Sequence, residues 1–437
     1  MPKTQSFVAG DGTSNALPSA YEVRECIVYA NSGKEYNITD LVGTILIQEA
    51  LGQESIDVEI GIIDAIQFLE NAIISGNEKI SLKIVHKSFK KDDKEKKKYD
   101  LKLRISEISG FVRSKPGTQS YHFICFSEHM YTNIIKKLIR PFEGSIGSII
   151  SNICKKDLKI EKIEKINTET KGIIKGIFPR LSPLDAITWL NRNAFDGQTP
   201  FYFTDTLAKG IIYDSYKSIC DSPVFKEYTM GLIETKTGTE EHYEAMSKQV
   251  IKLSSPMQMA SIVNLSEGAY ASTLHTLDMS TKKYNKFFFD YNVKNPKMLN
   301  KNKPFSDKTE IDGIKYNQTK DSKHYFVSTN KNSFEGAFDT YQDPSVPTIL
   351  EAQATNSNIQ TSSQTITVLG DFDMTPGKKI TLVLPKSMGI DASGTKDKII
   401  GGNYIVTDIT HQFYEEYQMV LEIKKDSSVI DMSGESL

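Results

Sequence analysis

Hydrophobic and polar residues alternate in several stretches of the first hundred residues of this chain. The clearest is Ile56–Ile62, and shorter stretches of the same kind lie at Ile80–Ile84 and Leu101–Ile105. A period of two is typical of β-strands that bury one face. Because frequent turn residues separate these stretches, they predict a small β-barrel or sandwich over residues 21–112.

A second group of alternating stretches lies near the C-terminus, at Ile366–Val368, Ile380–Leu384, Tyr404–Phe413 and Tyr417–Ile423. Two earlier segments, Ala271–Met279 and Lys286–Tyr291, also have the character of strands. We therefore predict a second, discontinuous barrel made of residues 226–290 and 360–425. The polar residues 291–359 between its parts are expected to form an insertion or a small subdomain.

The segment between the two predicted barrels has a helical period. Helices are expected at Glu128–Arg140, after a Ser145 cap, and after Ser182-Pro183, where serine caps and proline fits the first turn. With a hairpin expected at Phe201–Tyr213, these elements predict an α+β middle domain over residues 113–225. A further helix is expected from Ser255-Pro256 through Val263.

These segments together predict an α+β, mainly β chain with two tandem small barrels around the middle domain. Residues 1–20 are expected to be a flexible arm, and residues 426–437 a frayed tail. The length of 437 residues corresponds to about three domains.

The composition is that of an ordinary globular chain, with 39% hydrophobic residues and a formal net charge of −2. This balance excludes a disordered chain and a whole-chain nucleic-acid clamp, which would be basic. No run of 18 apolar residues and no signal peptide is found, so we expect no membrane span. The four cysteines are widely spaced and are expected to be reduced structural thiols, although a pairing in the folded state stays open.

The charges are unevenly distributed along the chain. Residues 1–77 hold 3 basic and 11 acidic residues, whereas residues 78–175 hold 23 basic and 12 acidic ones. Much of the positive excess lies in the lysine-rich segment His86–Tyr99. Such a block is typical of a solvated loop; the alternative is a docking patch for an acidic partner.

The sequence lacks the common catalytic motifs. We find no P-loop, no dinucleotide fingerprint, no His-Glu-x-x-His and no Gly-x-Ser-x-Gly. His122 and His129 flank a strand-to-helix junction but have too few companion ligands for zinc. His411, in an alternating strand, is more typical of a satisfied, half-exposed histidine than of a base. We therefore expect no enzyme activity, no cofactor and no metal.

Three C-terminal segments carry a resemblance to a known family. Gly370–Ile380 contains a Gly-Asp and a Pro-Gly before a strand, Gly402–His411 follows the pattern Gly-x-Tyr-x-Val-x-x-x-x-His, and Tyr417–Ile423 is the last strand. This order resembles the closing barrel of tail hub proteins from contractile-tailed bacteriophages, and the hub part of type VI secretion spike proteins.

The resemblance extends over about three quarters of the chain. The first barrel resembles the family through Val42–Glu49, Ile56–Ile62 and Gly76–Ile84, and the middle domain through Ile173–Ala194 and Phe201–Tyr213. Residues 292–360 have no counterpart in the pattern. With no needle repeat or lysozyme-like domain in the sequence, the chain is more similar to a separate hub subunit than to a fused spike.

The resemblance implies two tail-tube-like barrels and a structural role in the virion baseplate, in a particle assembled in the host cytoplasm. It implies a homotrimeric, pseudo-six-fold ring that joins a hexameric tail tube, or tube-initiator proteins, to a trimeric spike among other baseplate proteins. DNA would pass transiently through its channel. The similarity of the two barrels is implied by the family alone, since no repeat is visible in the sequence. The alternatives are a peptidoglycan-degrading tail-tip enzyme and a generic multi-domain binding protein.

A channel that DNA crosses should be neutral or acidic, because phosphates bind Lys and Arg strongly. In Ile56–Ile62 the apolar side chains should fill the barrel, so Asp57 and Glu59 should point outward, and we expect them to face the channel. The candidate docking loop, with Lys94, Lys96 and Lys97, is expected on the outside. The alternative is that both segments are simply solvated surface.

Overall fold

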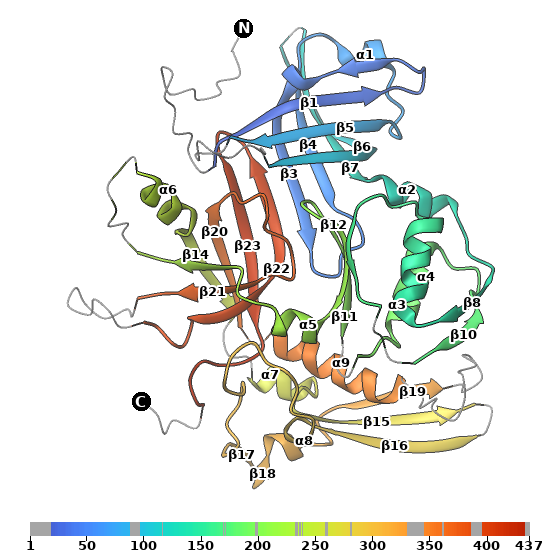
Figure 1. Cartoon of the computed structure of the whole chain (residues 1–437), viewed down its shortest axis with the longest axis vertical. Helices are drawn as coiled ribbons and strands as arrows, with labels where there is room; N and C mark the ends of the chain where they lie inside the picture. Colours follow the sequence, from blue (N-terminus) through green and yellow to red (C-terminus); the bar gives the residue numbers. More distant parts are fainter. Residues whose placement is uncertain are drawn as a thin grey trace.

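The computed structural model describes residues 19–87, 97–115, 117–168, 170, 172–196, 200–231, 235, 237, 239–257, 261–279, 282–329, 345–360, 362–385 and 396–432. Most of the expected N-terminal arm, the end of the expected tail, and Lys94 and Lys96 lie outside the described residues. Figure 1 shows four regions: an upper β half, a lower β half beside it, a mixed middle region, and a small sheet at the bottom.

The N-terminal half is an antiparallel sheet in the order β3-β4-β7-β6-β5-β1-β2. Its strands are β1 (Tyr21–Tyr29), β2 (Glu35–Asn37), β3 (Val42–Ala50), β4 (Asp57–Asp64), β5 (Lys79–His86), β6 (Lys98–Lys115) and β7 (Thr118–Ser127). A 3₁₀ turn (Thr39–Leu41) follows β2, and α1 (Phe68–Ala72) follows β4. Asp64 at the end of β4 accepts hydrogen bonds from the backbone N–H groups of Ile66 and Phe68, which holds the start of α1.

The C-terminal half has the order β14-β20-β23-β22-β21-β13. Its elements are β13 (Lys226–Thr229), α6 (Glu240–Ser247), β14 (Val250–Met257), β20 (Ser362–Leu369), β21 (Lys379–Val383), β22 (Gly402–Phe413) and β23 (Tyr417–Lys425). Strand β22 also pairs with β3, from Asp408 opposite Ala50 to Phe413 opposite Ile45. The described strands of both halves therefore form one continuous sheet.

The two halves repeat one topology. In chain order, β3, β4, β5, β6 and β7 correspond to β14, β20, β21, β22 and β23, and the order within the sheet is the same. Strand β1 also corresponds to β13, although β1 is antiparallel to β5 whereas β13 is parallel to β21. Each half is therefore a version of one β module.

A shared β-bulge supports this correspondence. The pairing of β6 with β7 shifts at Ser106, and the pairing of β22 with β23 shifts at Thr407. The Ser106 hydroxyl donates to the carbonyl of Ile124 on β7, at 3.0 Å, and the Thr407 hydroxyl donates to the carbonyl of Glu422 on β23, at 3.1 Å. Both modules therefore place a hydroxyl residue at the same irregular point and use it in the same way.

A second shared bulge lies on the first strand of each module, at Gly43 of β3 and at Ile251 of β14. With the strands aligned by these bulges, Lys79–Leu82 of β5 matches Lys379–Leu382 of β21, which reads Lys-Ile-Thr-Leu instead of Lys-Ile-Ser-Leu. The repeat that was not visible in the sequence is thus present, but its similarity in sequence is short.

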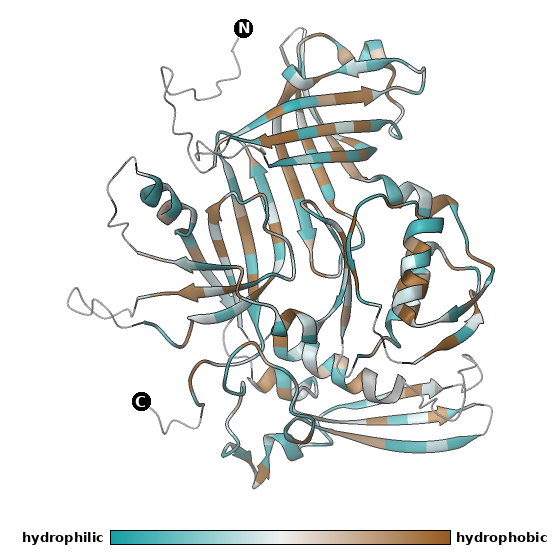
Figure 2. Ribbon diagram, in the orientation of Figure 1, coloured by the Kyte–Doolittle hydropathy of each residue, from teal (hydrophilic) through white to brown (hydrophobic). Residues whose placement is uncertain are grey.

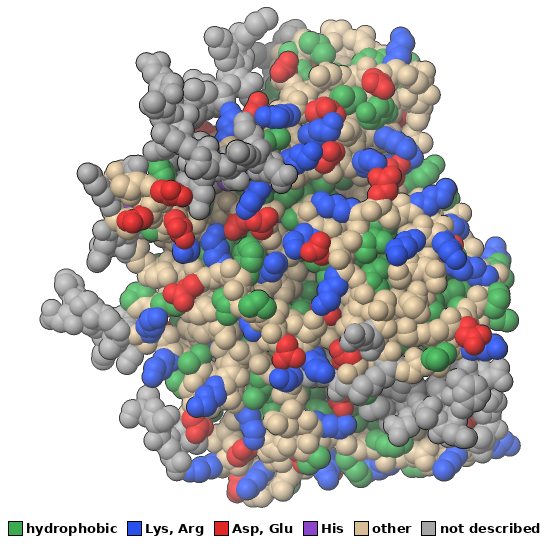
Figure 3. All heavy atoms as spheres, in the orientation of Figure 1, with side chains coloured by type: hydrophobic (Ala, Val, Ile, Leu, Met, Phe, Trp, Pro, Cys, Tyr) green, Lys and Arg blue, Asp and Glu red, His purple; other side chains and the backbone are tan. Residues whose placement is uncertain are grey.

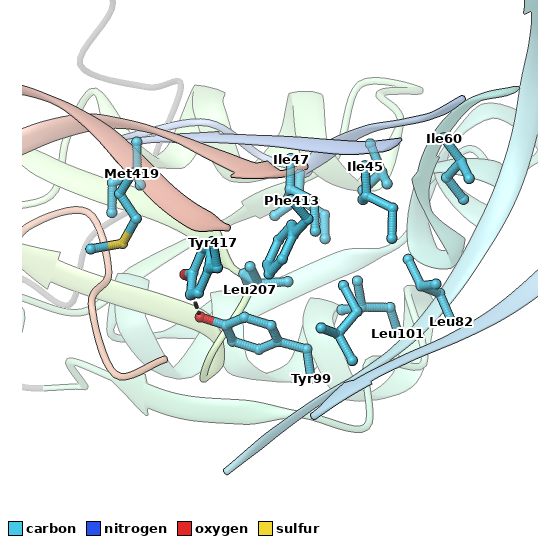
Figure 4. Close-up of a cluster of buried hydrophobic side chains, with 14 of the residues drawn as sticks. Ile45, Ile47, Ile60, Leu82, Tyr99, Leu101, Leu207, Phe413, Tyr417 and Met419 are labelled. Carbon is cyan, nitrogen blue, oxygen red and sulfur yellow. Dashed lines mark hydrogen bonds between the residues drawn. The ribbon is translucent and has the colours of Figure 1, made fainter. Parts of the chain in front are cut away.

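One hydrophobic core runs through both halves. Figure 2 shows hydrophobic and hydrophilic residues alternating along the strands, as the period of two predicts. Ile45, Ile60 and Leu82 of the first half are fully buried together with Phe413 and Met419 of the second (Figure 4). The shared core and the β3–β22 pairing join the halves into one body.

The middle region contains α2 (Glu128–Ile135), β8 (Pro141–Gly144), α3 (Ile146–Asn152), a π-helical turn (Ile153–Asp157), β9 (Ile163–Ile166), β10 (Ile174–Ile177), α4 (Pro183–Asn191), β11 (Phe201–Thr206), β12 (Gly210–Ser215) and α5 (Tyr216–Asp221). The two serine caps are confirmed: Ser145 accepts from Ser148 N and Ser182 from Asp185 N. The hairpin of β11 and β12 is also confirmed. Helix α2 ends five residues earlier than expected, at Ile135.

The bottom region pairs β15 (Ala271–Asp278) with β16 (Lys283–Asp290) and β19 (His324–Thr329), and α9 (Ser345–Ile359) contacts this sheet. It also contains α7 (Ser261–Ser266), α8 (Tyr291–Lys294), β17 (Glu310–Ile311), β18 (Ile314–Lys315) and a 3₁₀ turn (Tyr316–Gln318). Residues 271–290 were expected in the second barrel. They pair instead with a strand from the polar segment, because a period of two does not specify which strand is the partner.

The helix expected from Ser255-Pro256 is wrong. Ser255 and Pro256 lie in β14, which pairs with β20 and with no other described strand along its length. Proline is tolerated in such an edge strand, and this one sits where the pairing register shifts. The nearest helix, α7, begins only at Ser261.

The α+β, mainly β class is confirmed, and the strands expected near the C-terminus all lie in the second half. The pairings among the described residues do not close either half into a barrel, so the two barrels remain a prediction. No helix in the described part of the chain is both long and apolar enough to cross a membrane.

Candidate functional site

The outer side of the continuous sheet is acidic near its centre. On β4, Val58 and Ile60 are buried, whereas Asp57 is exposed and Glu59 half-buried on the opposite side, as the alternation predicted. Glu59 lies opposite Leu46 of β3. We refer to the side that carries these residues as the acidic face.

The pairing register carries the acidic face across neighbouring strands. Glu59 lies opposite Ile124 of β7, and Ile124 lies opposite Glu107 of β6. In the other direction, β3 pairs with β22 and β22 with β23, which brings Asp408 and Glu422 opposite each other on the same side. The carboxylates of the acidic face are Asp57, Glu59, Glu107, Asp408 and Glu422.

Some of these carboxylates have local partners. Glu59 Oε1 lies 2.8 Å from His122 Nδ1, and Asp57 accepts a 2.8 Å hydrogen bond from Gln53. Glu422 lies 3.0 Å from Lys424, which is on the same side of β23. The balance of this face is nonetheless acidic, since it gathers five carboxylates from the four strands β4, β6, β22 and β23.

The outer side becomes basic further along the N-terminal half. Lys79, Lys83, Lys102 and Arg104 project from β5 and from β6 ahead of its bulge. Lys83 pairs with Glu25 and Lys102 with Glu161. In the view of Figure 3, Lys and Arg side chains are interspersed with Asp and Glu rather than gathered in one patch. The excess of positive charge seen in the sequence is therefore partly compensated by acidic neighbours.

Of the three lysines proposed for the docking loop, the structure describes Lys97. Its ammonium forms an ion pair with Asp373, in the connection between β20 and β21. Both side chains are about half exposed, so the pair has high solvent screening. Lys97 thus contacts the C-terminal half rather than lying in an isolated loop.

A buried polar network lies where the halves meet. His411 of β22 contacts Glu49 Oε1 of β3 through Nε2, at 3.0 Å, and the Tyr417 hydroxyl of β23 through Nδ1, at 2.8 Å. The Tyr99 hydroxyl of β6 lies 3.3 Å from that of Tyr417 (Figure 4). His411 is therefore satisfied, as expected, but it is fully buried rather than half-exposed. Its strand is covered on both edges, and its side chain points into the core.

The histidine, carboxylate and tyrosines of this network are residue types that catalytic sites also use, but solvent does not reach them. All four side chains are at most 1% exposed. Burial, the largest cause, raises the pKa of Tyr99 and Tyr417 well above the ordinary value, so both hydroxyls stay protonated. The arrangement joins four strands of two modules, β3 and β6 with β22 and β23, and fixes their register.

The same carboxylate holds the middle region. Glu49 Oε2 accepts a 2.7 Å hydrogen bond from the backbone N–H of Leu207, between β11 and β12. Nearby, the backbone N–H of Gly52 donates to Thr204 Oγ1 at 3.0 Å, and Asp205 accepts from Ser127 Oγ and from Ile56 N. Burial raises the pKa of Asp205 above its ordinary value. The hairpin is thus docked through buried polar contacts.

The described residues contain no cluster of three or more His, Cys, Asp or Glu side chains able to hold a metal ion. His122 contacts Glu59, whereas His129 contacts the carbonyl of Glu54, so the two histidines have separate partners. All four cysteines are free and buried. Burial raises the pKa of Cys26 to about 12, which keeps its thiol protonated.

The comparisons with solved structures find similar folds at low sequence identity. A 43 kDa tail protein of prophage MuSo2 from Shewanella oneidensis aligns with a TM-score of 0.51 at 10% identity, over 92% of this chain and 98% of that one. A tail protein from Neisseria meningitidis aligns with a TM-score of 0.49 at 11% identity, over 93% and 97%. A component of the type VI secretion system of E. coli aligns with a TM-score of 0.43 at 9% identity, over 94% and 78%.

No model of a protein family matches the sequence, and no curated protein matches it either. The chain therefore shares the fold of a phage tail protein at a very low level of sequence identity. The match to the prophage MuSo2 tail protein confirms, at the level of fold, the resemblance to phage tail proteins indicated by the C-terminal motifs.

Proposed function

We propose that this chain is a structural hub of a phage tail baseplate. Three copies form a ring of six β modules that joins a six-fold tail tube to a three-fold central spike. Surrounding baseplate proteins and the tube are its other partners, and its place is the virion. Its role is mechanical and needs neither a catalytic group nor a cofactor.

The internal duplication is the observation that carries this proposal. A chain that contains one module twice offers two similar surfaces, so three chains offer six. Symmetry then allows one side of the ring to meet a hexamer and the other a trimer. The shared bulges at Ser106 and Thr407 support a true duplication rather than a coincidence of strand order.

The rigid connection between the modules also supports a mechanical role. Glu49 contacts both His411 of the second module and the backbone of Leu207 in the middle region. An adaptor that transmits force between two assemblies needs such fixed geometry. In the proposed ring each module closes into a tube-like barrel with its neighbours, which would remove exposed sheet edges.

We propose that the acidic face lines the channel. Repulsion between its carboxylates and DNA phosphates would let DNA pass without binding. Asp57 and Glu59 are then channel-facing residues. The basic outer side of β5 and β6, with Lys97 and the residues that follow the expected docking loop, would face other baseplate proteins.

The oligomeric state tests this function. Light scattering of the purified chain should give a mass three times the 49.1 kDa of the chain, and electron micrographs should show six lobes around a hole. A monomer at high protein concentration, with and without a spike protein, would contradict the proposal. Clear turnover of cell-wall sacculi would instead favour the peptidoglycan-degrading alternative.

A further inference from the structure

Two of the strand edges that are open in the described structure lie on β6 and β14. The second part of β6, Glu107–Lys115, pairs with β7 on one side and with no described strand on the other. Strand β14 pairs with β20 and with no described strand beyond it. Exposed backbone edges of this kind pair readily with another strand.

The duplication shows what these edges correspond to. By topology, β6 corresponds to β22 and β14 corresponds to β3. Within the chain, the first part of β22 pairs with β21, and its second part pairs with β3. Likewise the first part of β6 pairs with β5, but its second part lacks the equivalent of β3. That equivalent is β14.

The chain cannot satisfy this pairing by itself. In Figure 1, β14 lies at the left margin of the lower half, whereas β6 lies in the upper half next to β7. From β14 to β6, the sheet order passes through six other strands. A contact between different surfaces of like molecules is head-to-tail and closes into a ring when the rotation allows.

Apolar side chains are exposed at the open edges of β6 and β14, whereas they are buried at the β22–β3 junction within the chain. Phe111 on β6 is 53% exposed, and Ile251 on β14 is 49% exposed. At the internal junction the corresponding strands bury Ile45, Ile47 and other apolar side chains under a continuous sheet. Large apolar side chains beside an unpaired edge are typical of a surface that is covered in the assembly.

The register of the missing pair follows from the bulges. At the internal junction, Gln412 lies opposite Leu46. Counted from the shared bulges through β7 and β20, Val112 corresponds to Gln412 and Ser254 to Leu46. Compared with β22 and β3, each open edge contains one more residue. On β6 this residue lies between Ser109 and Val112, and on β14 it lies between Ser254 and Met257. The two additional residues would lie opposite each other. The residues before and after them on β6 would therefore keep the same partners on β14 as the equivalent residues of β22 have on β3.

We infer that the second part of β6 in one copy pairs antiparallel with β14 of the next copy, with Val112 opposite Ser254. The inference rests on the proposed ring and specifies how its copies join. It makes the contact between chains a repetition of the β22–β3 contact within the chain. The sheet then continues from copy to copy.

Disulfide cross-linking tests the pairing. Directly opposed residues in an antiparallel pair have Cβ atoms about 4.5–5.5 Å apart, close to the range that a disulfide accepts. A Val112→Cys/Ser254→Cys double variant of the full chain, oxidised and run on a non-reducing gel, should give a covalent trimer. The native cysteines are buried and should not react.

Two control variants separate register from mere proximity. Val112→Cys/Lys252→Cys moves one thiol two residues along β14, to a separation of about 7–8 Å, and should cross-link far less. Leu46→Cys/Gln412→Cys places thiols at the equivalent internal pair, and should form a disulfide within one chain.

The outcomes distinguish the pairing from the proposed function. A three-fold mass in light scattering without the Val112–Ser254 cross-link overturns the pairing and leaves the ring standing. Cross-linked ladders longer than three chains support the pairing and overturn the three-fold ring. A monomer without cross-links overturns both. If Val112→Cys/Lys252→Cys cross-links as well as Val112→Cys/Ser254→Cys, the proposed register is wrong.

Discussion

Replacing Glu49 by alanine should weaken the connection between all three parts of the chain. Its carboxylate accepts from His411 Nε2 at 3.0 Å and from Leu207 N at 2.7 Å, and the residue is 1% exposed. Loss of the carboxylate leaves a buried imidazole and a buried N–H without these partners. Hydrogen bonds to charged groups contribute about 1.5–3 kcal/mol each, so the two together predict a cost of about 3–6 kcal/mol.

That cost is a large fraction of the stability of a typical domain, about 5–15 kcal/mol. Urea unfolding of wild type and Glu49→Ala should show a lower midpoint. Because a chain of several regions need not unfold in one step, amide hydrogen exchange at Leu207 provides a local measurement. Its protection should fall in Glu49→Ala more than that of Ile60, deep in the first module.

Glu49→Gln is the matched control, because a glutamine retains an oxygen that can accept from Leu207. It should keep most of the Leu207 protection and lose only part of the stability. The reasoning would be refuted if Glu49→Ala unfolded within 1 kcal/mol of wild type and kept the Leu207 amide protected, taking about 1 kcal/mol as the effect of an ordinary substitution.

The two bulge hydroxyls should differ in effect: Thr407→Val, at a buried position, should cost about 1 kcal/mol in urea unfolding, and Ser106→Ala, at an exposed one, about half as much. Burial lowers the pKa of Lys425 from 10.5 to about 8, so the unfolded chain binds more protons between these values. Stability should therefore rise with pH in that window, and thermal melts of Lys425→Met should lack this rise. Changing both Asp57 and Glu59 to lysine should make the assembled ring retain short duplex DNA at low salt, with retention that falls as salt is added.

The channel prediction has a control of equal charge change. Glu35→Lys/Asp40→Lys alters two exposed carboxylates on and beside β2, away from the acidic face. If this variant retained DNA as strongly as the channel variant, or if neither did, the assignment of the acidic face to the channel would fail. Loss of infectivity alone would not distinguish the two, so binding is measured on purified rings.

Local patterns were sufficient for much of the secondary structure. Ser145 and Ser182 cap helices because a serine hydroxyl reaches the N–H three residues on, a contact within one turn. The alternation in β4 placed Val58 and Ile60 inward and Asp57 outward, because side chains of a strand alternate by geometry. Ser255-Pro256 misled for the same reason: the dipeptide suits a helix start, and only the pairing with β20 made it a strand.

The buried junction could not be read from local patterns. His411 and Glu49 are 362 positions apart, and nothing near either residue indicates the other. The separation of 271–290 from the second module likewise depends on β19, more than 30 residues downstream. Packing and strand register decide which distant residues come into contact. The sequence of a single strand does not specify either of them.

The sequence by itself determined most of the strands, which of their faces are buried and where two helices begin, since these depend on neighbours within a few residues. The duplication was decided only by the tertiary structure. Bulges and strand order are properties of the backbone, and many side chains satisfy them, so Lys79–Leu82 and Lys379–Leu382 retain a visible likeness while the rest has diverged. The open edges of β6 and β14 could be matched to each other only by comparison with the β22–β3 pair, which the folded chain contains.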